Sequence, residues 1–174
     1  MAYAKYRVTI YAVGPLSETL TGDDYYALGE FRLRIRRFLH FSEFAARQEG
    51  LEPQQHQLLL AVRCLQRDNG PTIGELAEHL LIRHHSAVGL IDRMEERGLI
   101  ERVRGAGDRR QVKVSLTASG ADKLERLSET HRAELRNSGP ALVEALSGLL
   151  RRLHADPIES NKEQDVPKPR QSYP

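Results

Sequence analysis

The stretch "TIGELAEHLLIRHHSAVGLIDRMEERGLIERVRGAGDRRQVKVSLT", residues Thr72–Thr117, has the pattern of two short helices followed by a β-hairpin. Thr72 and Glu75 have the Ser/Thr-x-x-Glu spacing of a capping box, which predicts that a helix begins there. Apolar residues at helical spacing then predict a second helix from about His84 to Arg97, which Gly98 ends. Two short helices joined by a tight turn make a helix-turn-helix.

The hairpin that follows is strongly basic. Two runs that are typical of strands, "IERV" and "QVKVSL", flank the loop "RGAGDRR", and residues 101–113 hold five basic and two acidic side chains. A helix-turn-helix followed at once by a basic hairpin indicates a winged helix. Arginine suits the narrow, negative minor groove of DNA because its guanidinium group is planar and always charged. The alternative is a solvated hairpin of mixed charge.

Helical patterns flank this stretch on both sides. Apolar residues spaced by three and four predict one helix over residues 24–49 and another over about 53–67. Thr117 is placed to cap a long helix after the hairpin, and we expect Gly139 and Pro140 to end that helix and start another. The predicted order is therefore helix, helix, helix-turn-helix, hairpin, helix, helix.

Composition narrows the class of protein. The 174 residues, 40% of them apolar, suit one folded domain, and the formal net charge of +2 decides little. A single cysteine excludes a disulfide within the chain and favours a reducing, cytoplasmic setting. No apolar run approaches the roughly 18 residues of a membrane span, so we expect no membrane association. We interpret residues 1–22 as a poorly determined extension and residues 155–174 as a disordered tail.

No pattern in the sequence predicts catalysis or a cofactor. It has no glycine-rich phosphate loop, no nucleophile elbow and no cluster of cysteine and histidine at metal-binding spacing. His84 and His85 are adjacent on a helix, where side chains point about 100° apart, so they rarely chelate one ion. We expect Cys64 to be a small buried apolar residue, with redox sensing as the alternative.

The segments "LEPQQHQLLLAV", "TIGELAEHLLIRHHSAVGLIDRMEERGLIERV", "GDRRQVKVSLTASG" and "HRAEL" together resemble the MarR (multiple antibiotic resistance regulator) family of bacterial transcription regulators. The resemblance implies a mainly α fold: a winged helix-turn-helix with a two-stranded β-wing and long N- and C-terminal dimerisation helices. On that fold, residues 23–154 form one domain. Its DNA-binding lobe covers about 53–116, and its dimerisation helices cover about 24–49 and 117–154.

The function implied by the resemblance is a homodimer that binds a pseudo-palindromic operator in double-stranded DNA and acts as a ligand-responsive repressor. The recognition helix enters the major groove, and Arg110, held by Asp108, enters the minor groove. The residues expected to contact DNA are Arg83, His84, His85, Ser86, Val88, Gly89 and Arg93 in the recognition helix, and Arg104, Asp108, Arg109 and Arg110 in the wing. Several recognition-helix positions depart from the Ser, Thr and Arg that are commoner in the family.

Many members of the family bind small aromatic or amphipathic ligands between the dimerisation helices and the DNA-binding lobe. The candidates to line such a pocket are Phe38, His40, Phe41, His56 and Arg63. The alternative is that the aromatic side chains form dimer core and the histidines lie on the surface. His56 and His131 could meet in three dimensions, which keeps metal sensing open. A winged helix that binds protein rather than DNA is an alternative of a different class.

Overall fold

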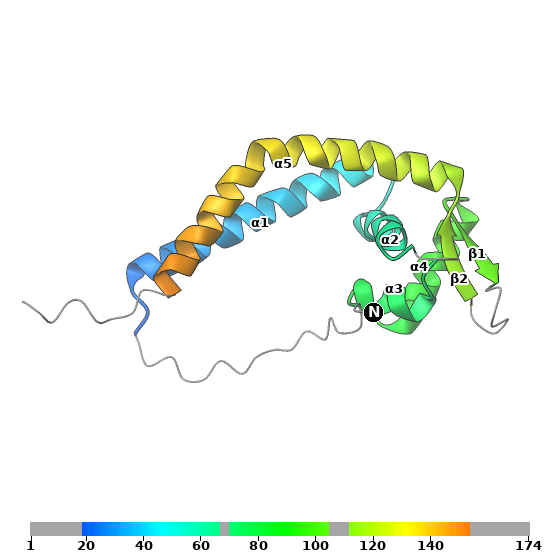
Figure 1. Cartoon of the computed structure of the whole chain (residues 1–174), viewed down its shortest axis with the longest axis horizontal. Coiled ribbons are helices and arrows are strands. Elements are labelled where there is room, and N and C mark those ends of the chain that lie inside the picture. The colour runs from blue at the N-terminus through cyan, green and yellow to red at the C-terminus, as the bar shows by residue number, and fades with distance from the viewer. Residues whose placement is uncertain (1–18, 67–69, 105–111, 154–174) are drawn as a thin grey trace, which may run out of the picture.

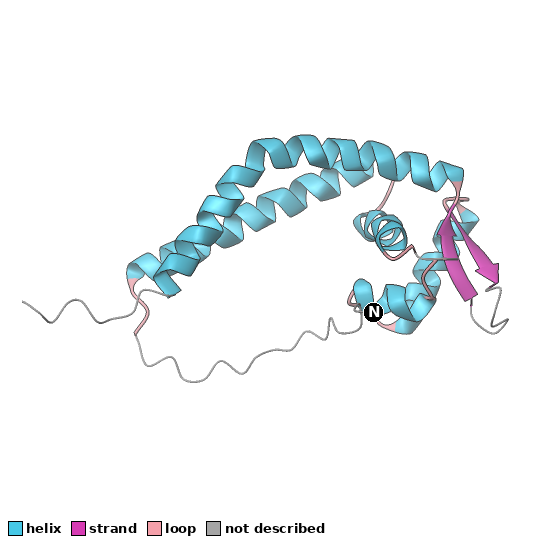
Figure 2. Ribbon diagram, viewed as in Figure 1, coloured by secondary structure: helices cyan, strands magenta, loops and turns pink. Residues whose placement is uncertain are grey.

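Residues 19–66, 70–104 and 112–153 are described by a computed structural model. They form a mainly helical fold with a two-stranded antiparallel sheet, which confirms the predicted fold class (Figure 1, Figure 2). The elements are α1 (Gly22–Gln48), α2 (Pro53–Cys64), α3 (Ile73–His79), α4 (His84–Glu96), β1 (Ile100–Arg104), β2 (Val112–Leu116) and α5 (Ala118–Leu153). Residues 1–18 and 154–174 fall outside the described residues, so most of the interpretation of the chain ends stays a prediction, although Gly22, assigned to the extension, already begins α1. Helix α2 ends at Cys64, three residues before its predicted end.

Figure 1 shows two parts of different shape. The arm consists of α1 and α5, which lie side by side along most of the length of α1. The lobe consists of α2, α3, α4 and the β1–β2 hairpin, gathered near the end of the arm where α1 ends and α5 begins. Within the described residues, the arm and the lobe contain no helix that is both long enough and apolar enough to cross a membrane.

The sequence predicts a helix break at Gly139 and Pro140, and this prediction is wrong. Helix α5 runs from Ala118 to Leu153 with Pro140 inside it. A proline inside a helix lacks an N–H donor and crowds the carbonyl group one turn earlier, which costs about 3 kcal/mol and bends the helix. Figure 1 shows that α5 bends along its length and that its second half descends beside α1. Packing against α1 therefore keeps this half helical where local signals favour a stop.

Threonine side chains begin α1, α3 and α5. Thr21 and Thr72 each form a complete capping box with the acidic residue three positions later. The Thr117 hydroxyl accepts a hydrogen bond from the Gly120 N–H at 3.1 Å and donates to the carbonyl oxygen of Gly98 at 2.7 Å. Gly98, at φ +66°, ends α4 as predicted, because a left-handed backbone favours glycine. Thr117 thus joins the end of α4 to the start of α5.

The turn between α1 and α2 is held from two sides. Arg97, directly after α4, donates to the carbonyl oxygen of Gly50 at 2.7 Å. Lys123 in α5 donates to the carbonyl oxygen of Glu49 at 2.6 Å, and Arg126 binds the Glu49 carboxylate through two nitrogens at 2.9 and 3.1 Å. The end of α4 and the first turns of α5 are therefore attached to one turn of the chain.

The apolar core lies almost wholly in the lobe. Side chains from α2, α3, α4 and the hairpin pack into one cluster, which the last turn of α1 and the first turns of α5 complete. In the described part of the arm, no apolar residue of α1 before Ala45 and none of α5 after Leu127 is buried. The largest fully buried side chains are Leu51, Leu58, Leu59, Leu76, Ile91, Met94, Ile100, Leu127, Val62 and Val114.

Candidate nucleic-acid interface

Helix α4, the predicted recognition helix, has one buried face and one exposed face. It begins at His84, as predicted, and ends at Glu96. Its buried face consists of Ala87, Leu90, Ile91 and Met94, which pack into the lobe. Of the seven residues expected to contact DNA from this helix, Arg83, His84, His85, Ser86 and Arg93 are exposed, and Val88 and Gly89 are partly exposed. All seven are available to a partner outside the lobe.

His85, Gly89 and Arg93 recur every four residues, so they share one face of α4. A Cβ atom added at Gly89 would lie 3.6 Å from Nη1 of Arg93, which is an ordinary van der Waals contact. The folded chain therefore accepts an alanine at this position, and its packing does not explain the glycine. The arginine side chain lies over Gly89, on the same face as the histidine.

The N-terminus of α4 lacks the side-chain cap found on α1, α3 and α5. Its N-cap residue is Arg83, whose side chain makes no capping hydrogen bond. Leu81, in the turn before it, has φ +55°, and Ile82 donates its N–H to the carbonyl oxygen of Ala77 at 3.0 Å, which closes the turn after α3. An uncapped helix N-terminus presents N–H groups and the positive end of the helix dipole, which favour an anionic group.

The base of the wing is fixed to the segment that precedes α3. Val114 in β2 donates its N–H to the carbonyl oxygen of Pro71 at 2.9 Å. A Cβ atom added at Gly70 would overlap the carbonyl oxygen of Val114, so this close approach requires glycine. Arg104 is the last residue of β1, and its side chain lies outside the described residues. Asp108, Arg109 and Arg110 also lie outside them, so their contact with DNA stays a prediction.

Arg102, which the sequence analysis counts only among the basic residues of the hairpin, joins the wing to α4. Its guanidinium group binds the carboxylates of Asp92 and Glu95 through separate nitrogens. The backbone N–H of Arg102 also donates to Oε1 of Glu95 at 3.1 Å. Burial acts to lower the pKa of Arg102, but its hydrogen bonds to Asp92 and Glu95 outweigh this effect and raise the pKa. The only sequence signal for this contact is the acidic pair Asp92 and Glu95, three residues apart on α4. Which basic residue pairs with them depends on how the hairpin folds back onto α4.

A second group of polar side chains lies where α1, α2 and α5 meet. Nδ1 of His131 donates to the carbonyl oxygen of Leu127 at 2.6 Å, and Nε2 lies 2.8 Å from the hydroxyl oxygen of Ser42. The His56 ring is buried, with its centroid 4.8 Å from that of His131, and its Nδ1 atom has no hydrogen-bond partner. Burial and, secondly, the charge of His131 lower the pKa of His56 to about 4.

The predicted ligand pocket is brought together only in part. The rings of Phe38 and Phe41 meet the His131 ring edge-on, with centroids 6.1 and 5.7 Å away, and His56 contacts the same ring, so three of the candidates gather around His131. The other two candidates, His40 and Arg63, are exposed, and Arg63 donates to Gln66 at 3.2 Å. His56 and His131 do meet, but the described residues contain no group of three side chains suited to a metal ion.

Cys64, the last residue of α2, is exposed. The expectation that it is a small buried apolar residue is therefore wrong. The buried positions of α2 are Gln55, His56, Leu58, Leu59, Ala61 and Val62, and Cys64 falls beyond them.

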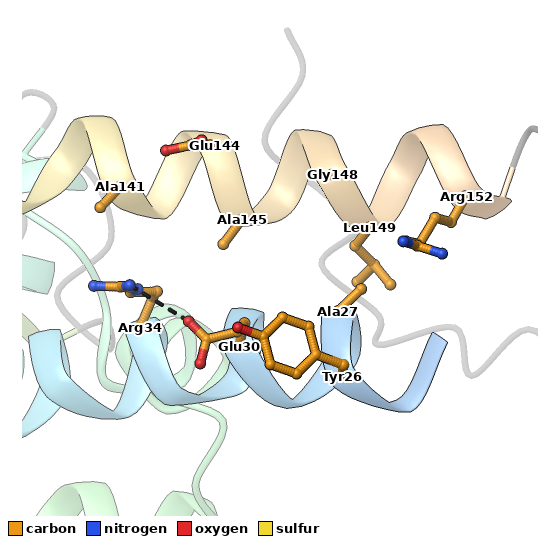
Figure 3. A pocket seen from close by; sticks show the side chains of 10 residues that line it. All are labelled: Tyr26, Ala27, Glu30, Arg34, Ala141, Glu144, Ala145, Gly148, Leu149 and Arg152. Atoms are coloured by element: carbon orange, nitrogen blue, oxygen red, sulfur yellow. Dashed lines mark hydrogen bonds and ion pairs between the residues drawn. The ribbon is translucent and has the colours of Figure 1, made fainter. Parts of the chain in front are cut away.

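A cavity of about 340 Å³ lies in the arm, between α1 and α5 (Figure 3). Small side chains, including those of Ala27 and Ala145, leave the space open. Arg34 and Glu30 form an ion pair at 3.4 Å on the α1 side. This cavity is formed by the arm alone, so it is a different place from the predicted pocket between arm and lobe.

Comparisons with known sequences find one family model and several transcriptional regulators. The sequence model described as "MarR family" matches residues 49–111. The transcriptional activatory protein BadR of Rhodopseudomonas palustris is 36% identical over 85 residues, which are 49% of this chain and 49% of that protein. The repressor NicR of Pseudomonas putida is 33% identical over 79 residues, 45% of this chain and 50% of NicR. The chain thus aligns with about half the length of these two relatives.

Solved structures show the same fold. AbsC, a MarR family regulator from Streptomyces coelicolor, matches with a TM-score of 0.61 and 23% identity over 79% of this chain and 94% of AbsC. A cysteine-to-serine mutant of MarR from E. coli, solved with operator DNA, matches with a TM-score of 0.56 and 21% identity over 79% of this chain and 99% of that one. This chain is therefore similar to the MarR family over residues 49–111, and its described residues share the fold of the solved MarR family structures.

Proposed function

We propose that this protein is a sequence-specific, DNA-binding transcriptional regulator that acts as a homodimer on a two-fold symmetric operator. The names of the relatives include both an activator, BadR, and a repressor, NicR. We propose that the protein represses transcription, because a dimer bound to a promoter blocks the access of other proteins to that promoter. The protein acts in the cytoplasm by binding DNA rather than as an enzyme.

The observation that carries this proposal is the surface of α4. Its first turns present Arg83, His84, His85 and Ser86 to solvent at a helix N-terminus without a side-chain cap. Polar and basic side chains at the start of an exposed helix are suited to base edges and phosphates in the major groove. We expect the arginines of the wing tip, which lie outside the described residues, to bind in the neighbouring minor groove.

The arm supports a dimer. Tyr25, Val143 and Leu150 are large apolar residues, and 63%, 63% and 43% of their respective surfaces are exposed. Large exposed apolar residues on two paired helices favour an interaction surface. A second copy of the same arm covers such a surface by two-fold symmetry and holds two α4 helices for half-sites about one helical turn, roughly 34 Å, apart.

A small aromatic or amphipathic ligand is proposed to act where α1, α2 and α5 meet. Phe38 and Phe41 supply apolar contact there, and the unpaired Nδ1 of His56 can bind a hydroxyl group. This position joins both arm helices to the lobe. A ligand that binds one arrangement of arm and lobe more tightly therefore shifts the spacing of the two α4 helices and changes the affinity for DNA.

The test is a fluorescence-anisotropy titration of the full chain against DNA from upstream of its own gene, with scrambled DNA as the control. Arg110→Ala is expected to weaken binding by more than about 1 kcal/mol, roughly fivefold. Arg36→Ala, which removes an exposed arginine from the arm, is the matched control and is expected to change affinity little.

Equal losses for the two arginine variants would show that the wing has no special part in binding. Weak binding to every DNA, with no preference for a two-fold site, would favour a winged helix that binds protein. The salt dependence separates these cases further. A dimer that contacts several phosphates loses affinity steeply as the salt concentration rises, whereas a protein-binding module does not depend on phosphate contacts.

A further inference from the structure

Helix α4 carries a negative charge on the face that is proposed to read DNA. Asp92 follows His85 by seven residues, which is close to two helical turns, so the two side chains lie on nearly the same face. Glu95 lies one turn further along, beside the wing. Both carboxylates are partly exposed, with 50% and 38% of their side-chain surfaces accessible. Bare carboxylates at this place would repel the phosphates of a bound duplex.

Arg102, in β1, pairs with both of these carboxylates. Its two terminal nitrogens bind Asp92 and Glu95 separately, and only 25% of its side chain is exposed. The Arg102 N–H adds a third bond to α4, the second to Glu95, so main chain and side chain of β1 are both attached to this helix. Val114, the register partner of Arg102 in β2, is fixed to Pro71, which gives the base of the wing a second attachment.

We propose that Arg102 is a positioning residue for DNA binding: it sets the angle between wing and recognition helix and screens Asp92 and Glu95 from the phosphates. This inference rests on the proposed function. The planar, forked guanidinium group of arginine can span two carboxylates, whereas the ammonium group of lysine is a single point charge. The two parts of the proposal, screening and positioning, can therefore be tested separately.

The first experiment is a cycle of variants with operator affinity as the measurement. Arg102→Gln is expected to lower the affinity roughly tenfold. The pair Asp92→Asn and Glu95→Gln is expected to restore most of this loss when added to Arg102→Gln. The same pair added to the wild type should change affinity far less, because Arg102 already screens both carboxylates. If the pair has the same effect in both backgrounds, Arg102 contacts DNA directly and the screening role is overturned.

The second experiment uses Arg102→Lys, which keeps the charge but cannot span both carboxylates. Hydrogen exchange at the amide groups of Val103 and Val114 reports the attachment of the hairpin to α4. Exchange that is faster than in the wild type, together with reduced operator affinity, is the expected result. Unchanged exchange with unchanged affinity would overturn the positioning role. This variant also serves if Arg102→Gln fails to fold.

Arg34→Gln is the matched control, because Arg34 also binds a carboxylate, that of Glu30 at 3.4 Å, but lies within α1, away from both the wing and the turn at Glu49. It is expected to leave operator affinity unchanged. If the wild type binds the operator and Arg102→Gln binds equally well, this inference fails alone. If the wild type has no preferred DNA in a genome-wide binding selection, both the proposed function and this inference fail.

Discussion

The lobe buries its apolar side chains and the arm exposes them, although both are built from amphipathic helices. Leu58 and Leu59 in α2 are fully buried, and so are Ile91 and Met94 in α4. In α5, by contrast, 63% of the surface of Val143 is exposed. The lobe thus completes its core within one chain, whereas the arm leaves large apolar side chains exposed. Burial thus marks the apolar residues that stabilise the fold, and exposure marks the apolar residues that can contact another molecule.

The largest expected effect is on the stability of the lobe. Leu58→Ala removes a fully buried side chain from α2 and leaves a cavity, so we expect the free energy of unfolding to fall by roughly 2–5 kcal/mol. Urea denaturation measures this loss. Leu60→Ala, on the exposed side of the same helix, is the control and should cost less than about 1 kcal/mol. Equal losses of unfolding free energy for the two variants would contradict the contrast between the buried and exposed faces of α2.

Acid should destabilise the junction between the two parts. The pKa of His56 is about 4 in the folded chain against 6.5 as its ordinary value, so folding favours the neutral ring. The resulting stability is present above pH 6.5 and is lost as the pH falls to about 4, at most about 3 kcal/mol. Unfolding free energies measured across this range should show a steeper fall for the wild type than for His56→Gln. His40→Gln, at an exposed position, should follow the wild type.

The exposed face of the arm can be tested without disturbing the lobe. Val143, Leu146 and Leu150 recur at spacings of three and four on α5. Replacing all three with alanine is expected to raise the dimer dissociation constant at least roughly 30-fold, about 2 kcal/mol. Sedimentation equilibrium measures this change, with Arg151→Ala as the control on the same helix. A triple variant that stays as dimeric as the wild type would mean that this face is covered by something other than a second arm.

The smallest expected difference concerns one motif that occurs in both parts. Thr72 and Thr21 each accept a hydrogen bond from the N–H three residues later, at 3.2 and 3.3 Å. Thr72→Ala should lower the free energy of unfolding by about 1 kcal/mol, because α3 is packed within the cooperative core. Thr21→Ala should cost less, because the exposed end of α1 can fray without unfolding the lobe. Thermal unfolding of the two variants compares these costs, and a larger loss at Thr21 would reverse the contrast.

Local signals predict most of the secondary structure. The capping box at Thr72, the glycine at Gly98 and the start of α4 at His84 are confirmed, because each depends on residues within one or two turns. Pro140 was predicted to end a helix and does not, because packing between α1 and α5 is not visible in the residues around it. Cys64 was predicted to be buried and is exposed for a similar reason, since the burial of each α2 side chain depends on which other elements pack over it.

The site is harder to predict than the fold because its contacts join distant segments. The sequence places α4 and its exposed residues correctly, but Arg102 meets Asp92 and Glu95 only when the hairpin folds back on α4. The group of Ser42, His56 and His131 comes from three helices. The sequence raises a contact between His56 and His131 as an open alternative. It does not predict the contact with Ser42 or the unpaired Nδ1 of His56.

The attachment of Arg97 and Lys123 to one turn gives the molecule the mechanics of a lever. The turn at Glu49 and Gly50 acts as the pivot, since it is fixed both to the end of α4 and to the first turns of α5. Helix α4, with its 13 residues, is about 20 Å long. A rotation of about 10° at its pivoted end moves the opposite end, where His84 lies, by about 3 Å, which is the length of a hydrogen bond. If α4 reads DNA as proposed, a small tilt of the arm is therefore enough to take that end of α4 out of bonding distance of a base edge.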